Sequence, residues 1–155
     1  VIPYKLQPGN LNYELSYGCI GINDYLLDIG QRLGASGSPR QIMQAAFDAF
    51  EVQEDLLAET LLSFLRDTPG VRIIGTAENK AAVLSFMVDG VHPHDVGTLL
   101  NEEGVAIRTG HHCAQQVMRR FGIPATSRAS FAFYNTMAEV DVLVAGIRKV
   151  QKVFG

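Results

Sequence analysis

Apolar residues recur along this chain with two different periods, and the order in which those periods alternate restricts the fold most. Spacings of three and four residues predict helices over 12–30, 39–68, 93–103 and 116–121, and from residue 136 onward. Short apolar runs predict strands over 71–75, 82–88, 105–107 and 128–133. Strands and helices are mixed, and no internal repeat is evident. We therefore expect an α+β fold in which helices pack against a small, mostly antiparallel sheet.

Local signals mark the ends of two of these helices. Ser38 followed by Pro39 is typical of an N-cap and first turn, and Thr136 with Glu139 forms a capping-box pattern. Residues 1–11 contain two prolines, a glycine and an asparagine, so they are predicted to form an extended arm or linker. The sequence then predicts one domain over 12–155.

Composition excludes several classes of protein. With 155 residues, of which 47% are apolar and 19% charged, the chain is globular and long enough to bury a core. No uncharged run approaches the roughly 18 residues of a membrane span, and a net charge of −3 gives no general attraction for nucleic acid. We expect no membrane and no nucleic-acid partner, and a cytoplasmic location because no signal peptide is visible. Since the first residue is Val1, we also expect a piece of a longer protein.

Arg-Thr-Gly-His-His-Cys-Ala-Gln at 108–115 is the strongest candidate for chemistry. A predicted strand precedes it and a predicted helix follows it, which places Cys113 in a loop directly after His111 and His112. The thiolate is the nucleophilic form of cysteine, and nearby positive charge or a helix N-terminus favours it. Burying Cys113 as an apolar filler would also bury two imidazoles at a cost. We therefore predict a reactive thiol at Cys113, whereas Cys19, within the apolar stripe of the first helix, is predicted to be a core residue.

The histidines also raise the question of a metal site. Metal ligands in short motifs are usually separated by two to five residues so that their side chains converge, whereas His111, His112 and Cys113 are consecutive. His92 directly precedes Pro93 and is predicted to cap a helix. We predict no metal site.

Two arginines flank the cysteine loop. Arg108 and Arg128 each lie at an end of a predicted apolar strand, beside small or apolar residues. An arginine in such surroundings costs free energy unless its charge meets an anion. Its planar guanidinium group can form two parallel hydrogen bonds with a carboxylate. We therefore expect a carboxylate-bearing substrate near Cys113. Arg119 and Arg120 lie on the following helix and are predicted to be either solvated or part of a partner surface.

These residues resemble a known family. Arg-Thr-Gly-His-His-Cys-Ala at 108–114, Arg-Ala-Ser-Phe-Ala-Phe-Tyr-Asn-Thr at 128–136 and Glu-Val-Asp at 139–141 resemble the C-terminal part of Suf-type (group II) cysteine desulfurases. Those enzymes, like the selenocysteine lyases, belong to the class V aminotransferases, pyridoxal-phosphate enzymes of fold type I. The similarity is specific over 104–154, looser but collinear over 71–103, and includes 1–34 as the segment that joins the family's large and small domains.

The resemblance implies a role for each residue of the loop and its flanks. Cys113 would be the nucleophile that takes sulfur from cysteine as a persulfide, releasing alanine. Arg128 would hold the substrate carboxylate, Arg108 would line the same pocket, and His111 and His112 would support the loop. The fold implied is that of the family's small C-terminal domain.

The resemblance also implies a cofactor, pyridoxal 5′-phosphate, in the full-length enzyme. The family's large domain carries the Schiff-base lysine, and none of Lys5, Lys80, Lys149 and Lys152 matches its motif. We therefore expect no cofactor bound to these 155 residues alone. Gly9 and Asn10 occupy the place of a threonine that, in the family, reaches the cofactor phosphate of the neighbouring subunit, although Pro8-Gly9-Asn10 departs from the usual Gly-Thr-Pro.

The partners implied are L-cysteine or selenocysteine, a SufE-like or SufU-like sulfur acceptor serving iron–sulfur cluster assembly, and a second subunit of a homodimer. The sequence leaves two other functions open. The chain could be a stand-alone sulfur carrier that uses Cys113 without pyridoxal phosphate. Selenocysteine lyase activity is the other, since a similar fold and cysteine serve both reactions.

Overall fold

The computed structural model describes residues 9–155. Internal contacts divide the chain into two compact units, Val1–Phe50 and Glu51–Gly155. The predicted arm over 1–11 falls mostly outside the described residues, and the predicted boundaries 1–11 and 12–155 stay a prediction. No helix within the described residues is long and apolar enough to span a membrane.

The first unit contains helices α1 (Tyr13–Gly18) and α2 (Ile20–Arg32) and the first part of α3 (Pro39–Asp67). The helix predicted over 12–30 is interrupted at Cys19, which closes α1 and precedes α2. Cys19 is exposed, so its predicted place in the core is wrong. Later in α2 the helix approaches α3 so closely that a Cβ atom on Gly30 would collide with the carbonyl oxygen of Ile42. Only glycine permits this packing.

The second unit is built on a four-stranded antiparallel sheet. Its strands are β1 (Val71–Ile74), β2 (Val83–Val88), β3 (Arg108–Gly110) and β4 (Thr126–Ser130), arranged in the order β1-β2-β4-β3. All three pairings are antiparallel. With helices on the sheet, this confirms the predicted α+β class.

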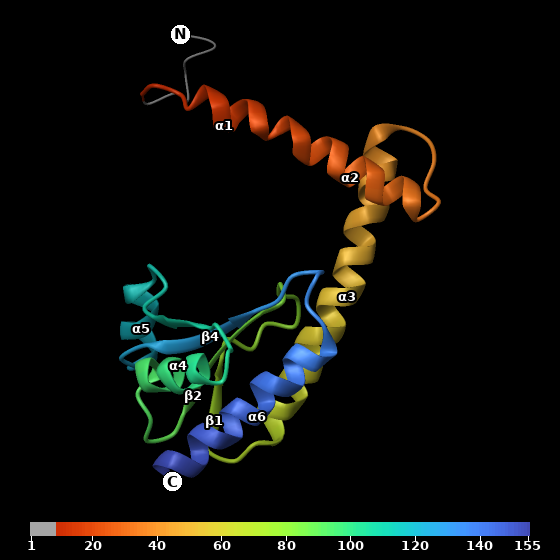
Figure 1. The fold of residues 1–155 in the computed structure, drawn as a ribbon. Coiled ribbons are helices and arrows are strands. Elements are labelled where there is room, and N and C mark those ends of the chain that lie inside the picture. Colours follow the sequence, from red (N-terminus) through yellow and green to blue (C-terminus); the bar gives the residue numbers. More distant parts are fainter. Residues whose placement is uncertain (1–8) are drawn as a thin grey trace. The chain divides into compact units, whose positions relative to one another are not determined.

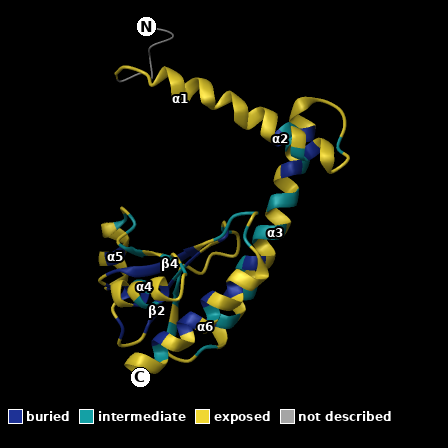
Figure 2. Ribbon diagram, viewed as in Figure 1, coloured by how far each residue is buried: buried dark blue, intermediate teal, exposed yellow. Residues whose placement is uncertain are grey.

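Helices cover one face of the sheet and form the core there. The end of α3 lies beside α6 (Met137–Phe154), and α4 (Pro93–Glu102) packs with them (Figure 1). The fully buried side chains come from all of these elements and include Leu57, Leu61, Phe86, Val96, Leu100, Val140 and Ile147. Burial of each large apolar side chain contributes about 1.5–3 kcal/mol. Dark blue in Figure 2 follows the inward stripe of α6, whose predicted capping box between Thr136 and Glu139 is present.

Two of the predicted strands are displaced in the structure. The run Val105–Ile107 is not a strand, because the Val105 amide donates to the carbonyl of Leu100 at 2.9 Å and ties this segment to the end of α4. The strand forms three residues later, as β3. The strand predicted over 128–133 instead spans Thr126–Ser130, and the chain turns at Ala132, whose carbonyl accepts from the Asn135 amide.

Candidate active site

Cys113 lies on a short loop between β3 and α5 (Gln115–Phe121). Its side chain is exposed. His112 and Cys113 both have left-handed backbones, with φ of 54° and 56°. Left-handed φ is uncommon for residues other than glycine, although histidine is among those that tolerate it best, and such strain clusters at functional sites. The predicted loop is therefore confirmed as a loop, with an unusual backbone at the predicted nucleophile.

His112 is attached to β4 by its ring. Its Nε2 lies 3.2 Å from the carbonyl oxygen and 3.0 Å from the hydroxyl of Thr126, a fully buried residue. Since a carbonyl oxygen can only accept, Nε2 carries the hydrogen. Nδ1 of the same ring is buried, and none of the described residues hydrogen-bonds to it.

The environment of His112 favours the neutral imidazole. Burial lowers the pKa of His112 below its ordinary value of 6.5, and the positive charges of Arg128 and Arg108 lower this pKa further. The hydrogen bond to the Thr126 backbone acts in the opposite direction. Neutral His112, with its hydrogen on Nε2, leaves a free acceptor lone pair on Nδ1.

Arg108 and Arg128 face each other across the β3–β4 ladder. The register continues through Ser85 of β2 to Ile74 of β1, so one row of side chains crosses all four strands. Leu84, Phe86 and Ala129 alternate with this row and point into the core. The arginines therefore lie on the sheet face opposite the core. The Nε atom of Arg128 is buried and has no partner among the described residues.

A cavity of about 370 Å³ lies between α5 and this outer face. Its polar lining includes His112, Ser85 and Arg128, and its apolar lining includes Ile74, Val83, Val117, Met118 and Phe121. His112 and Ala114, the residues on either side of Cys113, both line it. The structure thus brings Arg128 and the cysteine loop together at one cavity. The sequence predicts no role for Ser85 or Thr126, because only the strand register reveals their neighbours.

The other predicted residues lie in different surroundings. Arg119 and Arg120 are exposed in the last turn of α5. His92 caps α4 as predicted, accepting from the His94 amide through Nδ1 at 3.2 Å. Gly9, with Asn10 directly after it, is exposed in the first unit.

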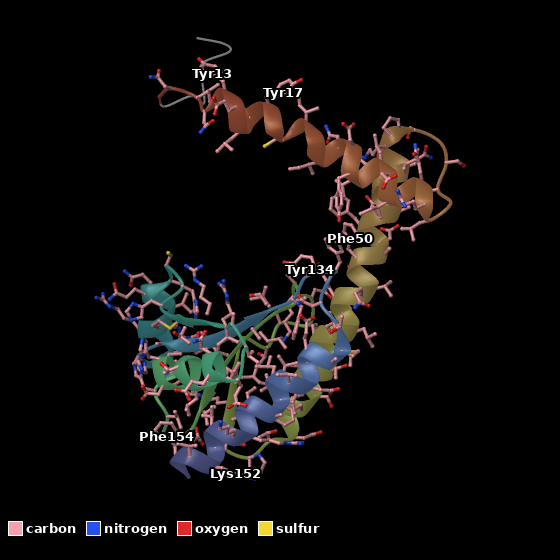
Figure 3. The ribbon with its side chains drawn as sticks, viewed as in Figure 1. Tyr13, Tyr17, Phe50, Tyr134, Lys152 and Phe154 are labelled. Carbon is pink, nitrogen blue, oxygen red and sulfur yellow. The ribbon has the colours of Figure 1, made fainter. Side chains whose placement is uncertain are left out.

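Chemically, the outer face carries two opposed guanidinium groups, and the loop that leaves β3 carries an exposed thiol. Residues 9–155 contain no group of three or more His, Cys, Asp or Glu side chains arranged to hold a metal ion. None of the described lysines lines the cavity at Arg128. Lys149 is paired with Glu103, and Figure 3 shows Lys152 near the end of α6. These residues fit a carboxylate and a sulfur nucleophile, and they do not fit covalent attachment of pyridoxal phosphate.

Fold and site together define a class of protein. Residues 31–143 match the family described as Aminotransferase class-V, so the chain belongs to the class V aminotransferase family. Its curated relatives include a probable cysteine desulfurase of Streptomyces coelicolor, 43% identical over 99% of this chain and 33% of the relative. A cysteine desulfurase of Synechococcus elongatus is also 43% identical, over 94% of this chain and 22% of the relative. The chain thus spans a third or less of the length of these relatives.

Solved structures with the same fold bear similar names. The chain is similar to the cysteine desulfurase CsdA (S-sulfonic acid) from Escherichia coli, with a TM-score of 0.63 and 31% identity over 78% of this chain and 32% of that one. It is also similar to the apo cysteine desulfurase of Thermococcus onnurineus, with a TM-score of 0.67 and 35% identity over 74% of this chain and 29% of that one. The predicted resemblance to the cysteine desulfurases is confirmed.

Proposed function

We propose that the chain provides the sulfur-accepting part of a pyridoxal-phosphate-dependent cysteine desulfurase. One observation carries the proposal. Arg108 and Arg128 are paired on the outer face of the sheet, and the loop that bears Cys113 leaves the same strand, β3, two residues after Arg108. A carboxylate bound by the arginines would therefore hold its amino acid close to the thiol.

Arg128 is the residue to which we assign the substrate carboxylate. Its buried Nε–H lacks a partner, and leaving a buried charged donor unsatisfied is costly. A carboxylate oxygen would satisfy that donor, and the planar guanidinium suits two parallel hydrogen bonds. Arg108, more exposed and directly opposite in the ladder, does not line this cavity, and we assign it a second positive charge next to Arg128.

Cys113 is the proposed nucleophile. Its thiolate gives an electron pair to the sulfur of the bound cysteine and forms an S–S bond. The substrate's carbon–sulfur bond breaks, its electron pair stays on the carbon, and that carbon takes a proton, so alanine leaves and Cys113 holds a persulfide. Pyridoxal phosphate supplies the electron sink that makes such a bond cleavable. We propose that residues beyond this chain bind the cofactor, because the described lysines here do not fit its attachment.

The remaining assignments follow from the family. His111 and His112 support the loop, and Gly9 with Asn10 contributes to the cofactor phosphate site of a neighbouring subunit in a homodimer. A SufE-like or SufU-like protein accepts the persulfide sulfur for iron–sulfur cluster assembly in the cytoplasm. The names of the relatives, all cysteine desulfurases, support sulfur transfer from cysteine as the whole protein's reaction.

The stand-alone sulfur carrier is the second candidate function. It is favoured by one observation: the chain has an exposed thiol and two paired arginines, and none of the lysines within residues 9–155 lines the cavity at Arg128. Such a carrier would accept sulfur from a persulfide donor without pyridoxal phosphate. Selenocysteine lyase activity would use the same residues on a selenium-containing substrate.

Cys113→Ser in the complete enzyme tests the proposal, with Cys19→Ser as its matched control. The hydroxyl is a far weaker nucleophile at neutral pH and cannot hold a persulfide, so sulfide release from cysteine should vanish while the cofactor's visible absorbance persists. Cys19→Ser, which changes an exposed thiol of the first unit, should leave both signals unchanged. Desulfuration that survives Cys113→Ser would remove Cys113 from this role.

A further inference from the structure

We propose that His112 is the positioning residue of the cysteine loop: its imidazole, hydrogen-bonded to Thr126, holds the left-handed backbone of His112 and Cys113 and so fixes the direction of the thiol. This inference rests on the proposed function for its meaning in sulfur transfer. The restraint of the loop backbone by His112 can be measured without any activity.

The backbone of the loop needs an external restraint. His112 and Cys113 are consecutive residues with positive φ, and each such residue costs free energy relative to an ordinary right-handed or extended backbone. Inside the loop, one backbone hydrogen bond of 2.9 Å joins the Ala114 amide to the carbonyl of His111. That single bond closes a tight turn but does not connect the turn to the sheet.

Thr126 provides a rigid point for the restraint. It is fully buried at the first position of β4, where it is the register partner of Gly110, the last residue of β3. The loop therefore departs from the sheet opposite Thr126 and is tied back to the same residue by the His112 ring. Only His111 lies between Gly110 and His112, so the hydrogen bond from His112 to Thr126 restrains the loop close to its start.

The chemistry of the ring suits an anchor. Nε2–H donates to Thr126, and the fixed carbonyl determines which nitrogen carries the hydrogen. Protonation of Nδ1 would leave that donor in place, so the anchor persists in either charge state. Cys113 itself is exposed, which is what delivery to a bound substrate or an acceptor requires.

The test compares His112→Leu with His112→Gln by amide hydrogen exchange in this chain. Leucine fills a similar volume without a donor, whereas the glutamine amide offers an N–H near the position of Nε2. We expect the Ala114 amide to exchange about tenfold faster in His112→Leu, as loss of one hydrogen bond allows, and within about threefold of the parent in His112→Gln. Amides of α6 serve as the internal control and should keep their protection in both variants.

An unchanged Ala114 amide in His112→Leu, with α6 still protected, would overturn the proposal. If His112→Leu unfolds the chain, which loss of α6 protection would reveal, Thr126→Val decides instead. It replaces the hydroxyl with a methyl group and leaves the carbonyl acceptor in place, so Ala114 exchange should accelerate only about threefold, and no acceleration would overturn the anchor.

Kinetics of the complete enzyme supply the second readout. His112→Leu should lower kcat about tenfold with an unchanged KM for cysteine, because Arg108 and Arg128 still bind the carboxylate, and His112→Gln should restore most of kcat. A rise in KM with constant kcat would contradict a positioning role. If the complete enzyme released no sulfur from cysteine at all while Ala114 still responded as expected, the proposed function would fail and the anchor would stand.

Discussion

Arg108 lies directly opposite Arg128 in the antiparallel ladder of β3 and β4. Like charges at directly opposed positions of a sheet repel each other, and such pairs are destabilising. Neither strand gains stability from this pair unless an anion lies between the two guanidinium groups. Such an opposition is expected of the anion-binding site that we propose here, at some cost to the stability of the fold.

Relief of this repulsion should be measurable in the chain itself. Arg108→Gln is expected to raise the free energy of unfolding by about 0.2–1 kcal/mol at low ionic strength, because it removes one of two opposed charges. The gain should shrink at 0.5 M salt, which screens the parent's repulsion. Urea unfolding at 20 mM and 0.5 M NaCl measures both effects. A loss of stability at low salt would show that the pair is not repulsive.

Arg128→Lys should mainly affect substrate binding in the complete enzyme. Lysine keeps the positive charge but cannot form bidentate hydrogen bonds with a carboxylate, and it lacks the buried Nε–H of Arg128. The KM for cysteine should therefore rise by the equivalent of about 1.5–3 kcal/mol, roughly 10- to 150-fold. Arg72→Lys is the control, since Arg72 is an exposed arginine of β1 in another row of the same sheet. Equal KM values in Arg128→Lys and the parent would make Arg128 a structural residue only.

His112 should titrate below 6.5, because burial and the two arginines oppose its positive charge. The unfolded chain then binds more protons than the folded chain in this range, so the contribution of His112 to stability is present above pH 6.5 and is lost as the pH falls through its folded pKa. NMR titration of the ring should place its pKa higher in Arg128→Gln than in the parent. Arg72→Gln should leave it unchanged, and an unmoved pKa in Arg128→Gln would contradict the electrostatic coupling.

The sequence predicts the helices of this fold better than its strands. The cap at His92 and the capping box of Thr136 and Glu139 are local signals, and both are present in the structure. Strand positions depend on pairing with distant residues. Apolar Val105–Ile107 looks like a strand, yet its backbone is used by the end of α4, and β3 forms instead from Arg108, Thr109 and Gly110.

The same limit applies to the site. The sequence around the loop predicts a reactive Cys113 and nearby arginines. These predictions depend on the residues that adjoin each position in the chain. The opposition of Arg108 and Arg128 follows from a register that no local pattern encodes, and so does the contact between His112 and Thr126. Left-handed angles at two consecutive residues are likewise unexpected from propensity, because tertiary contacts must hold them.

The length of the cysteine loop limits how far sulfur can travel. Two residues, His111 and His112, separate Cys113 from the end of β3, and Ala114 alone separates it from α5. Each residue spans at most about 3.6 Å, so the thiol cannot move far from the sheet. We therefore expect the acceptor to dock beside the loop and to bring its own thiol, or a metal-held thiolate, to Cys113.

The surface next to the loop suits an acidic partner. Residues 104–138 contain four arginines and no aspartate or glutamate, in a chain whose net charge is −3. Arg119 and Arg120 are exposed on α5, beside Val117 and Phe121, which are 43% and 52% exposed. Positive charge around a small apolar centre favours association with a negatively charged protein face.

The complete enzyme should therefore turn over slowly with cysteine alone and severalfold faster with a SufE-like or SufU-like acceptor. Reversing the charges of Arg119 and Arg120 to glutamate should reduce this acceleration more than the basal rate, because rim charges act mainly on association. The control is the double reversal of Arg66 and Lys152, which makes the same change in net charge on exposed positions elsewhere in the second unit. Sulfide or alanine production measured against acceptor concentration separates the two effects. Fast basal turnover that no acceptor alters would contradict the argument from the short loop, and equal losses in both double variants would show that only net charge matters.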